Sequence, residues 1–458
     1  MTDGLRIRVL HLFTLALSGL VLGACAGSGV QPYKPQPYRP QPGALCSTTV
    51  TAQVVALDSA IFANRLGAQL PDAMIFALAT DVEPTDGANP ADWTTWKAGE
   101  VALKDYKRAR PLTLRVNQGQ CLTVQFRNLV ADTINTASVP AYPSCTQGTQ
   151  GTGTGKCCPN PAQAPGTDGL CQTSQPQTRR ASLHVQGLNW MTGPGDDGSW
   201  VGTNASSLRD PGTPVNPGDP AMTYRLYAPE EGPFLLYSTG DVFSANAGPP
   251  GGGSPNGGDG GQLQQGLFGA LTVEPRDSEH YRSQVTFEDL CLATVGHAWA
   301  GSTCTLPAGG GPRKIDYAAV YPAGHPRAGL PVLRMAQKTG AGAWNTVHSD
   351  LTAVITGPNA GRFLDKTSPT FHEVAVTPDR LEPYREFTIV YHEMFRDTQA
   401  FWQLYQDSQL TSSLESVNDN FAINYGMGGI GSEILANRFS RGPMADCLDC
   451  KYEEFFLS

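Results

Sequence analysis

The sequence predicts an all-β protein, built from two β-sandwich domains that follow an export signal and a proline-rich tether. Three observations support this prediction. Short segments of alternating or β-branched residues recur along the chain. Glycine and proline, which end such segments in turns, are abundant, with 51 Gly and 36 Pro in 458 residues. Only residues 397–414 have the apolar spacing of an amphipathic helix.

The first 24 residues have the organisation of a bacterial export signal. Arg6 and Arg8 form a short basic region, and the apolar stretch at 9–22 is shorter than the about 20 residues that a membrane-spanning helix needs. The order Leu-Gly-Ala-Cys then ends at Cys25 and resembles the bacterial lipobox, in which the cysteine is acylated. We expect Cys25 to carry a lipid; the alternative is an ordinary signal peptide with an unrelated cysteine.

The lipid on Cys25 implies a place in the cell envelope. Ala26 follows the cysteine where an aspartate would favour the inner membrane, so we expect the outer membrane, with the protein facing the periplasm or the exterior. Residues 25–45 form the predicted tether, since a Gln-Pro-Tyr-basic-Pro unit occurs twice, at 31–35 and 36–40. Proline at this density favours an extended, semi-rigid chain.

The first sandwich domain is placed at residues 46–275, where strand signals follow one another closely. Residues 49–56 are rich in β-branched side chains, and residues 112–116 and 121–128 alternate on either side of a turn at Gly119. Further strands are predicted at 222–227, 232–238 and 266–275. Many short strands with Gly and Pro turns are typical of a sandwich or barrel.

The second domain is placed at residues 276–458, after a polar stretch at 276–281. Its strands are predicted at 352–356, 372–377 and 386–392, and they precede the helix expected within 397–414. The whole chain has only 16% charged residues and a net charge of −9. Nucleic-acid binding calls for a basic stripe, so this composition excludes that class of partner.

Ten cysteines remain once Cys25 is removed, and an even number fits disulfides in an oxidising compartment. Cys291 and Cys304 bracket a short loop and are one candidate pair. Four more candidates lie in a Gly/Pro/Thr-rich excursion: Cys145, Cys157, Cys158 and Cys171. Cys447 and Cys450 are either a disulfide, a redox pair or half of a metal site. Zinc would need two more ligands at similar spacing, which the sequence lacks, so the disulfide is favoured.

Three segments between residues 110 and 275 carry a family resemblance. Residues 182–188, Ser-Leu-His-Val-Gln-Gly-Leu, are similar to a His-x-His-Gly copper motif. Residues 232–239, Gly-Pro-Phe-Leu-Leu-Tyr-Ser-Thr, stand where that pattern has Gly-Thr-Phe-Trp-Tyr-His-Ser-His, and 265–273 match its closing strand. Together they resemble the multicopper oxidases, and the resemblance is weaker over 276–458. It implies two cupredoxin-like Greek-key sandwiches and a copper-dependent oxidoreductase ancestry.

Most of the copper ligands that this resemblance implies are absent. The family takes two His-x-His pairs from this domain, and of those four positions only His184 is a histidine. The degenerate positions are Gln186, Tyr237 and Thr239, whose oxygens are poor replacements for imidazole at copper. We expect no three-copper cluster, and copper at His184 would be weakly held. A structural histidine on an apolar strand is favoured over a lone copper ligand.

The ligands of the family's C-terminal domain are absent as well. That domain supplies a His-Cys-His segment, but no histidine follows His392 in this chain. The chain ends at Ser458 in a stretch that reads like a strand. We therefore expect the second domain to be incomplete, as in the leading part of a truncated or split oxidase whose C-terminal domain is supplied by a partner chain.

Three functions stay open at this point, and the sequence leaves undecided whether the chain is an enzyme. The first is a lipid-anchored multicopper-oxidase-like protein without its own three-copper site. The second is a non-catalytic cupredoxin-fold binding or scaffold module at the cell surface. The third, passive copper handling, is disfavoured because the eight methionines form no Met-x-x-Met cluster. The pair Asp196 and Asp197 is interpreted as a turn before Gly198 rather than a metal site, and no nucleophile motif accompanies His392 and Glu393.

Overall fold

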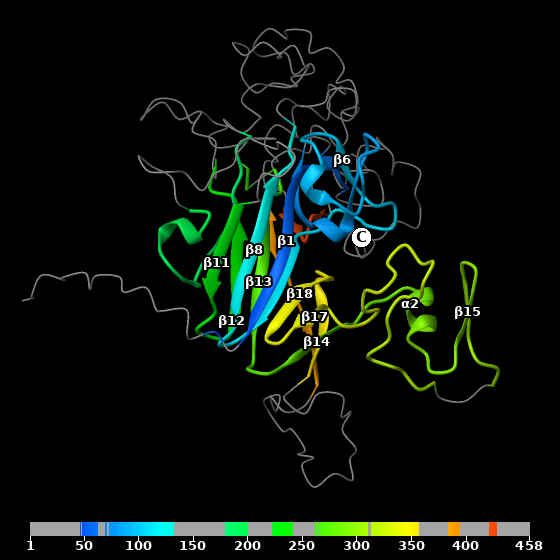
Figure 1. Cartoon of the computed structure of the whole chain (residues 1–458). Helices are drawn as coiled ribbons and strands as arrows, with labels where there is room; N and C mark the ends of the chain where they lie inside the picture. The colour runs from blue at the N-terminus through cyan, green and yellow to red at the C-terminus, as the bar shows by residue number, and fades with distance from the viewer. Residues whose placement is uncertain are drawn as a thin grey trace, which may run out of the picture. The chain divides into compact units, whose positions relative to one another are not determined.

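The computed structural model describes residues 46, 48–62, 69–70, 73–131, 179–199, 222–240, 262–263, 265–309, 313–356, 383–393 and 421–427. Strands dominate these residues, and they contain one α-helix, so the predicted all-β fold class is confirmed (Figure 1). The export signal, the tether, the strand at 372–377 and the helix at 397–414 lie outside them. In this part of the chain, no helix has the length and hydropathy needed to cross a membrane.

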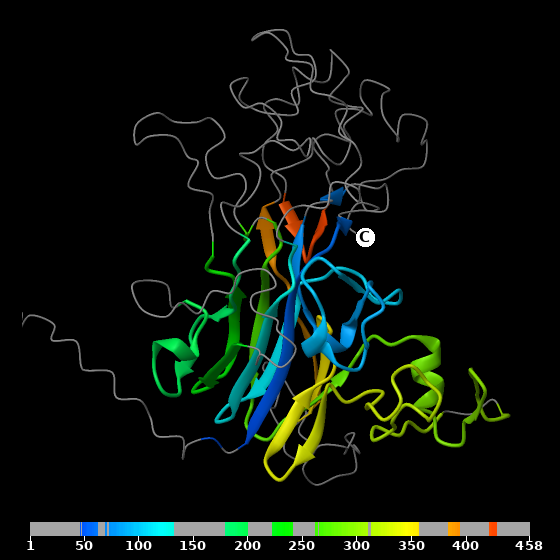
Figure 2. The same cartoon turned by 45° about the horizontal axis from the view of Figure 1, so that its top comes forward.

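A seven-stranded sheet forms one layer of the sandwich, in the order β10-β11-β8-β1-β18-β17, with β4 also paired to β1. Its strands are β1 (Thr49–Asp58), β4 (Met74–Leu78), β8 (Cys121–Asn128), β10 (Asn189–Trp190), β11 (Met222–Tyr227), β17 (Ala336–Gly340) and β18 (Ala343–Thr346). Strand β8 runs parallel to β1 over residues 49–56, and the other edge of β1 is divided between β18 at 49–51 and β4 at 54–58. Figure 2 shows the yellow hairpin β17–β18 next to β1.

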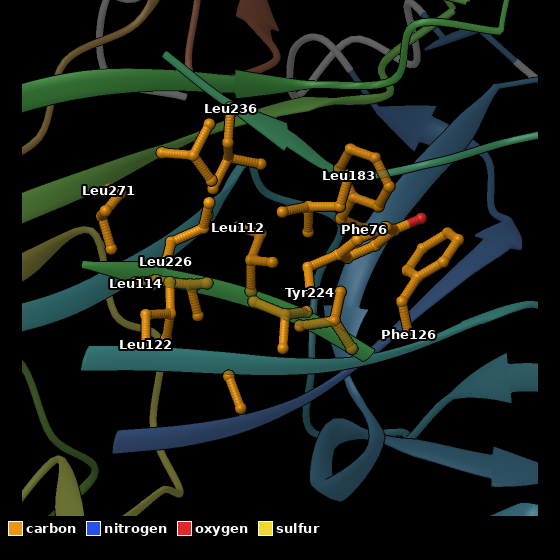
Figure 3. Close-up of a cluster of buried hydrophobic side chains, with 14 of the residues drawn as sticks. Phe76, Leu112, Leu114, Leu122, Phe126, Leu183, Tyr224, Leu226, Leu236 and Leu271 are labelled. Carbon is orange, nitrogen blue, oxygen red and sulfur yellow. The ribbon is translucent and has the colours of Figure 1, made fainter. Parts of the chain in front are cut away.

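The second layer is a four-stranded sheet in the order β7-β13-β12-β9. Its strands are β7 (Leu112–Asn117), β13 (Phe268–Glu274), β12 (Gly232–Tyr237) and β9 (His184–Val185). Apolar side chains from both sheets meet between the layers, among them Leu114, Phe126, Tyr224 and Leu271, which are all completely buried (Figure 3). Burial of each such side chain contributes about 1.5–3 kcal/mol, so this core is the main source of the sandwich's stability.

A second core covers the outer face of β1 and β4. Residues 79–109, which include β5 (Val82–Pro84) and β6 (Val101–Leu103), place Val82 and Trp96 over Val55 and Ile75. Strand β4 is therefore buried along its whole length. A strand with apolar neighbours on both faces gains from an unbroken apolar run, which is why β4 shows no alternation in the sequence.

The residues after 275 form smaller sheets and also extend the large one. Strands β14 (Glu279–Arg282), β19 (Thr352–Thr356) and β20 (Tyr384–Phe387) make a three-stranded sheet, and β21 (Tyr391–Glu393), β22 (Phe421–Ile423) and β23 (Gly426–Met427) make another. The strand predicted at 386–392 is thus divided into the end of β20 and the start of β21. Because β17 and β18 join the large sheet, residues on both sides of position 275 share one layer; the two-domain division stays a prediction.

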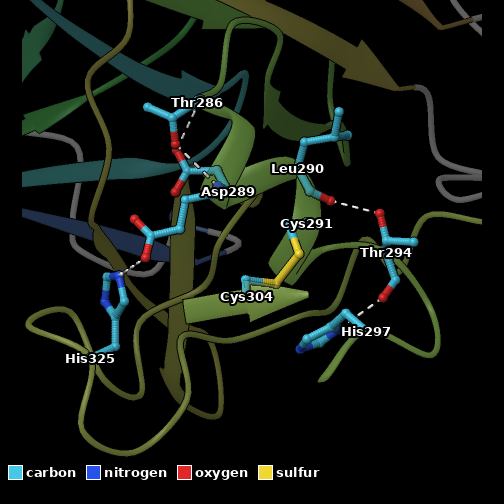
Figure 4. The surroundings of a disulfide bond; sticks show 9 residues. Thr286, Asp289, Leu290, Cys291, Thr294, His297, Cys304 and His325 are labelled. Carbon is cyan, nitrogen blue, oxygen red and sulfur yellow. Dashed lines mark hydrogen bonds and ion pairs between the residues drawn. A yellow bond between two sulfur atoms is a disulfide. The ribbon is translucent and has the colours of Figure 1, made fainter. Parts of the chain in front are cut away.

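Two disulfides lie in the described residues. Cys46 is joined to Cys121, 75 residues away, and this bond fixes the start of the folded chain to β8. Cys291, on helix α2 (Phe287–Leu292), is joined to Cys304 on β16 (Thr303–Thr305), which pairs with β15 (Ala298–Ala300); this is the pair that the short loop suggested (Figure 4). Two short pairs complete the elements, β2 (Ile61–Phe62) with β3 (Gln69–Leu70) and β5 with β6.

Asp289 connects helix α2 to the residues around it. Its backbone N–H donates to Thr286 Oγ1 at 3.1 Å, and its carboxylate accepts from Arg282 at 3.1 Å, Arg327 at 3.0 Å and the Tyr321 hydroxyl at 2.7 Å. Burial alone would raise the pKa of Asp289, but the charge of Arg282 and the hydrogen bond from Tyr321 lower it below the ordinary value. The side chain is completely enclosed and carries a negative charge that the two arginines neutralise.

Asp289→Ala is therefore expected to lower the free energy of unfolding by about 3–5 kcal/mol, because it leaves buried guanidinium groups without a counter-charge. Urea unfolding followed by tryptophan fluorescence measures the loss. The matched control is Glu288→Ala on the same helix, whose side chain is 42% exposed and 3.6 Å from His325. An exposed pair contributes about 0–1 kcal/mol. Equal losses in the two variants would contradict the role assigned to Asp289.

Candidate functional site

Strands β9 and β12 bring two of the predicted copper-motif positions together at the edge of the four-stranded sheet. His184 lies directly opposite Tyr237 in the antiparallel register. Their rings meet edge to face, with centroids 5.1 Å apart. Strand β9 ends the sheet, so this edge faces no further strand of that sheet. The His184 side chain keeps 17% of its surface exposed, and it is the imidazole around which the candidate site is built.

Asp197 fixes the orientation of His184. Both carboxylate oxygens lie 2.8 Å from His184 Nδ1, and the same carboxylate accepts from Ser199 Oγ at 2.6 Å and Trp190 Nε1 at 3.3 Å. Burial alone raises the pKa of Asp197, but the hydrogen bonds from His184 and Ser199 outweigh it and lower the pKa. Since a carboxylate only accepts, Nδ1 carries a proton, and in the neutral ring Nε2 is then the nitrogen that holds the lone pair.

Thr239 belongs to a closed hydrogen-bond network beside this pair. Its hydroxyl donates to the Gly198 carbonyl at 2.7 Å, so Ser182 Oγ, 3.1 Å away, is the donor toward Thr239 Oγ1. The Thr239 backbone N–H returns a bond to Ser182 Oγ at 3.3 Å. The neighbouring Ser238 donates to Gln262 at 2.6 Å. These buried polar groups satisfy one another without any ion.

Two glycines let the backbone form this edge. Gly187 has φ +82°, and a Cβ there would lie 2.4 Å from the Phe234 ring. A Cβ on Gly198 would lie 2.3 Å from the Leu183 carbonyl oxygen, whose bond from Gly198 N brings Asp197 up to β9. Only glycine permits such close approach. The Gly after Gln186 and the Asp-Gly pair therefore serve the packing that holds His184 and Asp197 together.

Gln186 is the exception among the four motif positions. Its backbone N–H donates to the Leu235 carbonyl at 3.0 Å, and its side chain is exposed. Within the described residues, no side-chain hydrogen bond joins Gln186 to His184, Tyr237 or Thr239. The structure thus brings three of the four positions into one polar edge and leaves the Gln186 side chain at the surface.

The donors at this edge do not fit a three-copper cluster. Such a cluster needs several neutral nitrogen ligands around closely spaced ions. Here one imidazole nitrogen is free, and the Thr239 hydroxyl is bound to a carbonyl. Elsewhere in the described residues, no group of three or more His, Cys, Asp or Glu side chains has the arrangement of a metal site.

The other histidines of the described residues have structural roles. His280 donates from Nε2 to Asn117 at 2.7 Å and His348 to the Pro331 carbonyl at 2.8 Å. Burial, helped by Arg115, lowers the pKa of His280 to about 3, and burial with Arg282 lowers that of His348 to about 4, so both are neutral. His392 Nε2 accepts from the Tyr425 backbone N–H at 3.1 Å, and its ring packs on Phe268. The His392 ring therefore has a packing role between Phe268 and Tyr425.

Several predicted site residues fall outside the described part of the chain. They are the lipidation residue Cys25 and the disulfide candidates Cys145, Cys157, Cys158, Cys171, Cys447 and Cys450. Conversely, the Asp-Asp-Gly sequence at 196–198 predicts a turn, whereas in the structure Asp197 is the hydrogen-bond partner of His184. His184 and Asp197 are 13 residues apart, and no local sequence pattern predicts a contact at that separation. The Asp-Gly pair at 197–198 is the one sequence feature that marks the position.

Comparison with known proteins gives distant structural neighbours. No protein-family model matches the sequence, and no curated protein matches it. Solved structures that resemble it include a multi-copper oxidase from Pseudomonas thermotolerans, with 15% identity, 50% of this chain and 30% of that chain covered, and a TM-score of 0.22. The multicopper oxidase mgLAC has 11% identity, 50% and 39% coverage and a TM-score of 0.23.

A third neighbour, Lac15 from a marine microbial metagenome, has 15% identity, 49% and 32% coverage and a TM-score of 0.22. The matched region spans between 30% and 39% of these three proteins. TM-scores of this size do not place the chain in their family. The chemistry of the edge at His184 is therefore argued from its own side chains.

Asp197→Asn tests the hydrogen bonds to His184. We expect a loss of about 1–3 kcal/mol in the free energy of unfolding at neutral pH, because an amide cannot accept from all three donors. Since the pKa of Asp197 is lowered in the folded state, its stabilisation is present above the ordinary value of 3.8 and disappears as the pH falls through the folded value. The gap between wild type and variant should therefore shrink in acid. Urea unfolding at several pH values measures it.

The control for this series is Asp316→Asn, an exposed carboxyl far along the chain that accepts only from the Ala318 backbone at 2.9 Å. It should change the free energy of unfolding little at any pH. A gap for Asp197→Asn that stays constant down to strongly acidic pH would show that the ionised carboxylate is not the stabilising form.

Proposed function

We propose that the chain is an exported, lipid-anchored, multicopper-oxidase-like protein that forms no three-copper centre of its own. One observation carries the proposal. The sheet edge at β9 and β12, where the copper motifs of the family would fall, offers a single imidazole whose Nδ1 is bound to Asp197. The Thr239 hydroxyl beside it is already bound to the Gly198 carbonyl.

The chemistry of this edge favours a polar network over metal binding. Tyr237 and Thr239 offer oxygen donors whose protons must leave before they bind copper, and Thr239 would also give up its bond to Gly198. His184 Nε2 alone is a monodentate ligand and holds copper weakly. Oxidation of a substrate by oxygen therefore depends on a partner chain that brings further histidines, as expected for the leading part of a split oxidase.

The second candidate is a non-catalytic binding or scaffold module at the cell surface. The mutual satisfaction of Ser182, Thr239, Ser238 and Gln262 favours it, because a network complete in itself needs no cofactor for folding. The two candidates differ in what a partner adds. Co-expression with an adjoining reading frame that encodes a His-Cys-His segment should produce copper-dependent oxygen uptake in the first case and none in the second.

Copper binding by the purified chain is the direct test. After excess copper and desalting, we expect at most one weakly held ion per chain, no blue absorption near about 600 nm and no oxygen uptake with a phenolic substrate. Metal analysis, absorption spectroscopy and an oxygen electrode measure these. His184→Ala should remove any residual ion, whereas the control His297→Ala, whose ring bonds the Thr294 carbonyl, should not. Three tightly held ions with oxygen uptake would contradict the proposal.

The anchor is tested separately in a bacterial host. Cys25→Ser removes the thiol that would be acylated, so the protein should move from the membrane fraction to the soluble fraction. Fractionation followed by immunoblotting measures this, and Cys46→Ser serves as a control that changes a different N-terminal cysteine, the one joined to Cys121. Unchanged membrane association of the Cys25→Ser variant would refute lipid anchoring at that residue.

A further inference from the structure

Two carboxyl groups and one arginine are buried together where β20 meets β7 and β13. Arg115 on β7 and Glu274 on β13 have side chains only 3% and 2% exposed, and Glu386 on β20 is 15% exposed. Arg115 Nη2 lies 2.6 Å from Glu386 Oε1, and Nε donates to the same carboxylate at 2.8 Å. Glu274 Oε1 lies 3.8 Å from Arg115 Nε, at the limit of an ion pair.

The donors of Arg115 are already used by other groups. Nη1 donates to the Asp350 carbonyl at 2.7 Å, and Nη2 reaches the Leu351 carbonyl at 3.4 Å in addition to Glu386. Glu274 Oε2 accepts from the Tyr384 hydroxyl at 3.0 Å, but Glu274 Oε1 is buried and accepts no hydrogen bond from any described residue. A bare, buried carboxylate oxygen is costly. A proton on Oε1 removes this cost, since it turns the oxygen into a donor toward the Glu386 carboxylate.

The charge balance leads to the same assignment. One guanidinium neutralises one carboxylate, so two ionised carboxylates would leave a net negative charge in a buried site. The groups that face the cluster do not supply a second positive charge. His280 on β14 is neutral, Tyr384 on β20 is a phenol, and Glu231 adds only negative charge near Tyr384. The Asp350 carboxylate is paired with Arg110 and Arg282.

We propose that Glu274 and Glu386 share one proton and act as a latch that holds β20 on the sandwich and releases it when the proton is lost in alkali. In the closed state Glu274 is the neutral donor and Glu386 the ionised acceptor beside Arg115. Opening transfers the Glu274 proton to water, and two carboxylates then repel each other across one arginine. In support, burial and the neighbouring Glu386 raise the pKa of Glu274 to about 9, while Arg115 and Glu274 lower that of Glu386 against the effect of burial.

Strand β20 is the element that can yield to this repulsion. Among the described residues it pairs on one side, with β19 over residues 384–387. Directly after β20, the Thr388 backbone N–H donates to the Leu351 carbonyl at 2.8 Å. Further along, the Tyr425 hydroxyl donates to the Gly266 carbonyl and its ring packs on Phe268, which holds β21–β23 in place. Release of Glu386 therefore loosens β20, while these contacts hold the residues that follow it on the sandwich and the sandwich core stays intact.

Hydrogen exchange of the full mature chain from about pH 6 to pH 10 tests the latch, after correction for intrinsic exchange. Protection of the β20 amides should fall at least about tenfold in the alkaline half of this range, since each pH unit above the pKa costs a factor of ten in the protonated form. Glu274→Gln keeps the donor permanently, so its β20 protection should stay constant. The matched control Glu288→Gln, whose side chain on α2 is 42% exposed, should behave like wild type.

Glu386→Gln is a second variant that tests the proposal independently in the same hydrogen-exchange experiment. Without its competitor, Glu274 becomes the partner of Arg115 and ionises, so the alkaline loss of protection should disappear in this variant too. An undiminished alkaline loss in Glu274→Gln, or a wild type whose β20 protection is flat across the range, would overturn the proposal. Unchanged protection of the core strand β8 in every sample separates latch opening from global unfolding.

Discussion

The buried negative charge of Asp350 fixes how the residues after β14 are attached to the sandwich. Its carboxylate is held by Arg110 at 2.8 Å and Arg282 at 2.7 Å, and its carbonyl accepts from Arg115 at 2.7 Å. Burial would raise the pKa of Asp350, but Arg110 and Arg282 lower it well below the ordinary range. A buried ion pair is costly to break because each partner leaves an uncompensated charge. Arg282 continues the chain of charges to Asp289 and Arg115 continues it to Glu386, so helix α2 and strand β20 take their positions from the same network.

The apolar core could be predicted further from the sequence than this network. Alternation predicts β7 and β8, and β-branched residues predict β1; apolar side chains of all three strands meet in the core. Strand β4 has no alternation because both of its faces are covered. Strands β17 and β18 contain no buried residue, so neither shows an alternation of buried and exposed positions. Helix α2 begins at a Thr-x-x-Asp capping box at Thr286, which is a local sequence signal for the start of a helix.

Polar sites could not be predicted to the same degree, since their partners are distant in sequence. Arg115 and Glu386 are 271 residues apart in the sequence. The apolar pattern of a strand predicts which face it buries, but it does not predict which distant charged residue lies against that face. The motif positions His184, Tyr237 and Thr239 could be grouped because the resemblance placed them on two neighbouring strands. Asp197 could not, because its role depends on Gly198 packing against Leu183. The parallel pairings of β1 with β8 and of β7 with β13 also join strands that are distant in the sequence, so they could not be predicted from local patterns either.

Under the proposed function, the His184–Asp197 pair indicates which copper ligands a partner chain would need to bring. A carboxylate that accepts from Nδ1 fixes the ring and its tautomer, which is the arrangement that orients histidine ligands in metal sites. The same bond also satisfies a half-buried imidazole with no metal at all. What separates the two uses is the surroundings of Nε2. In this chain the adjacent positions hold Tyr237, whose ring edge meets the imidazole, and Thr239, whose hydroxyl is bound to Gly198. A partner that turned this edge into a copper site would therefore have to place its own nitrogen ligands around Nε2, while the chain described here contributes one oriented imidazole.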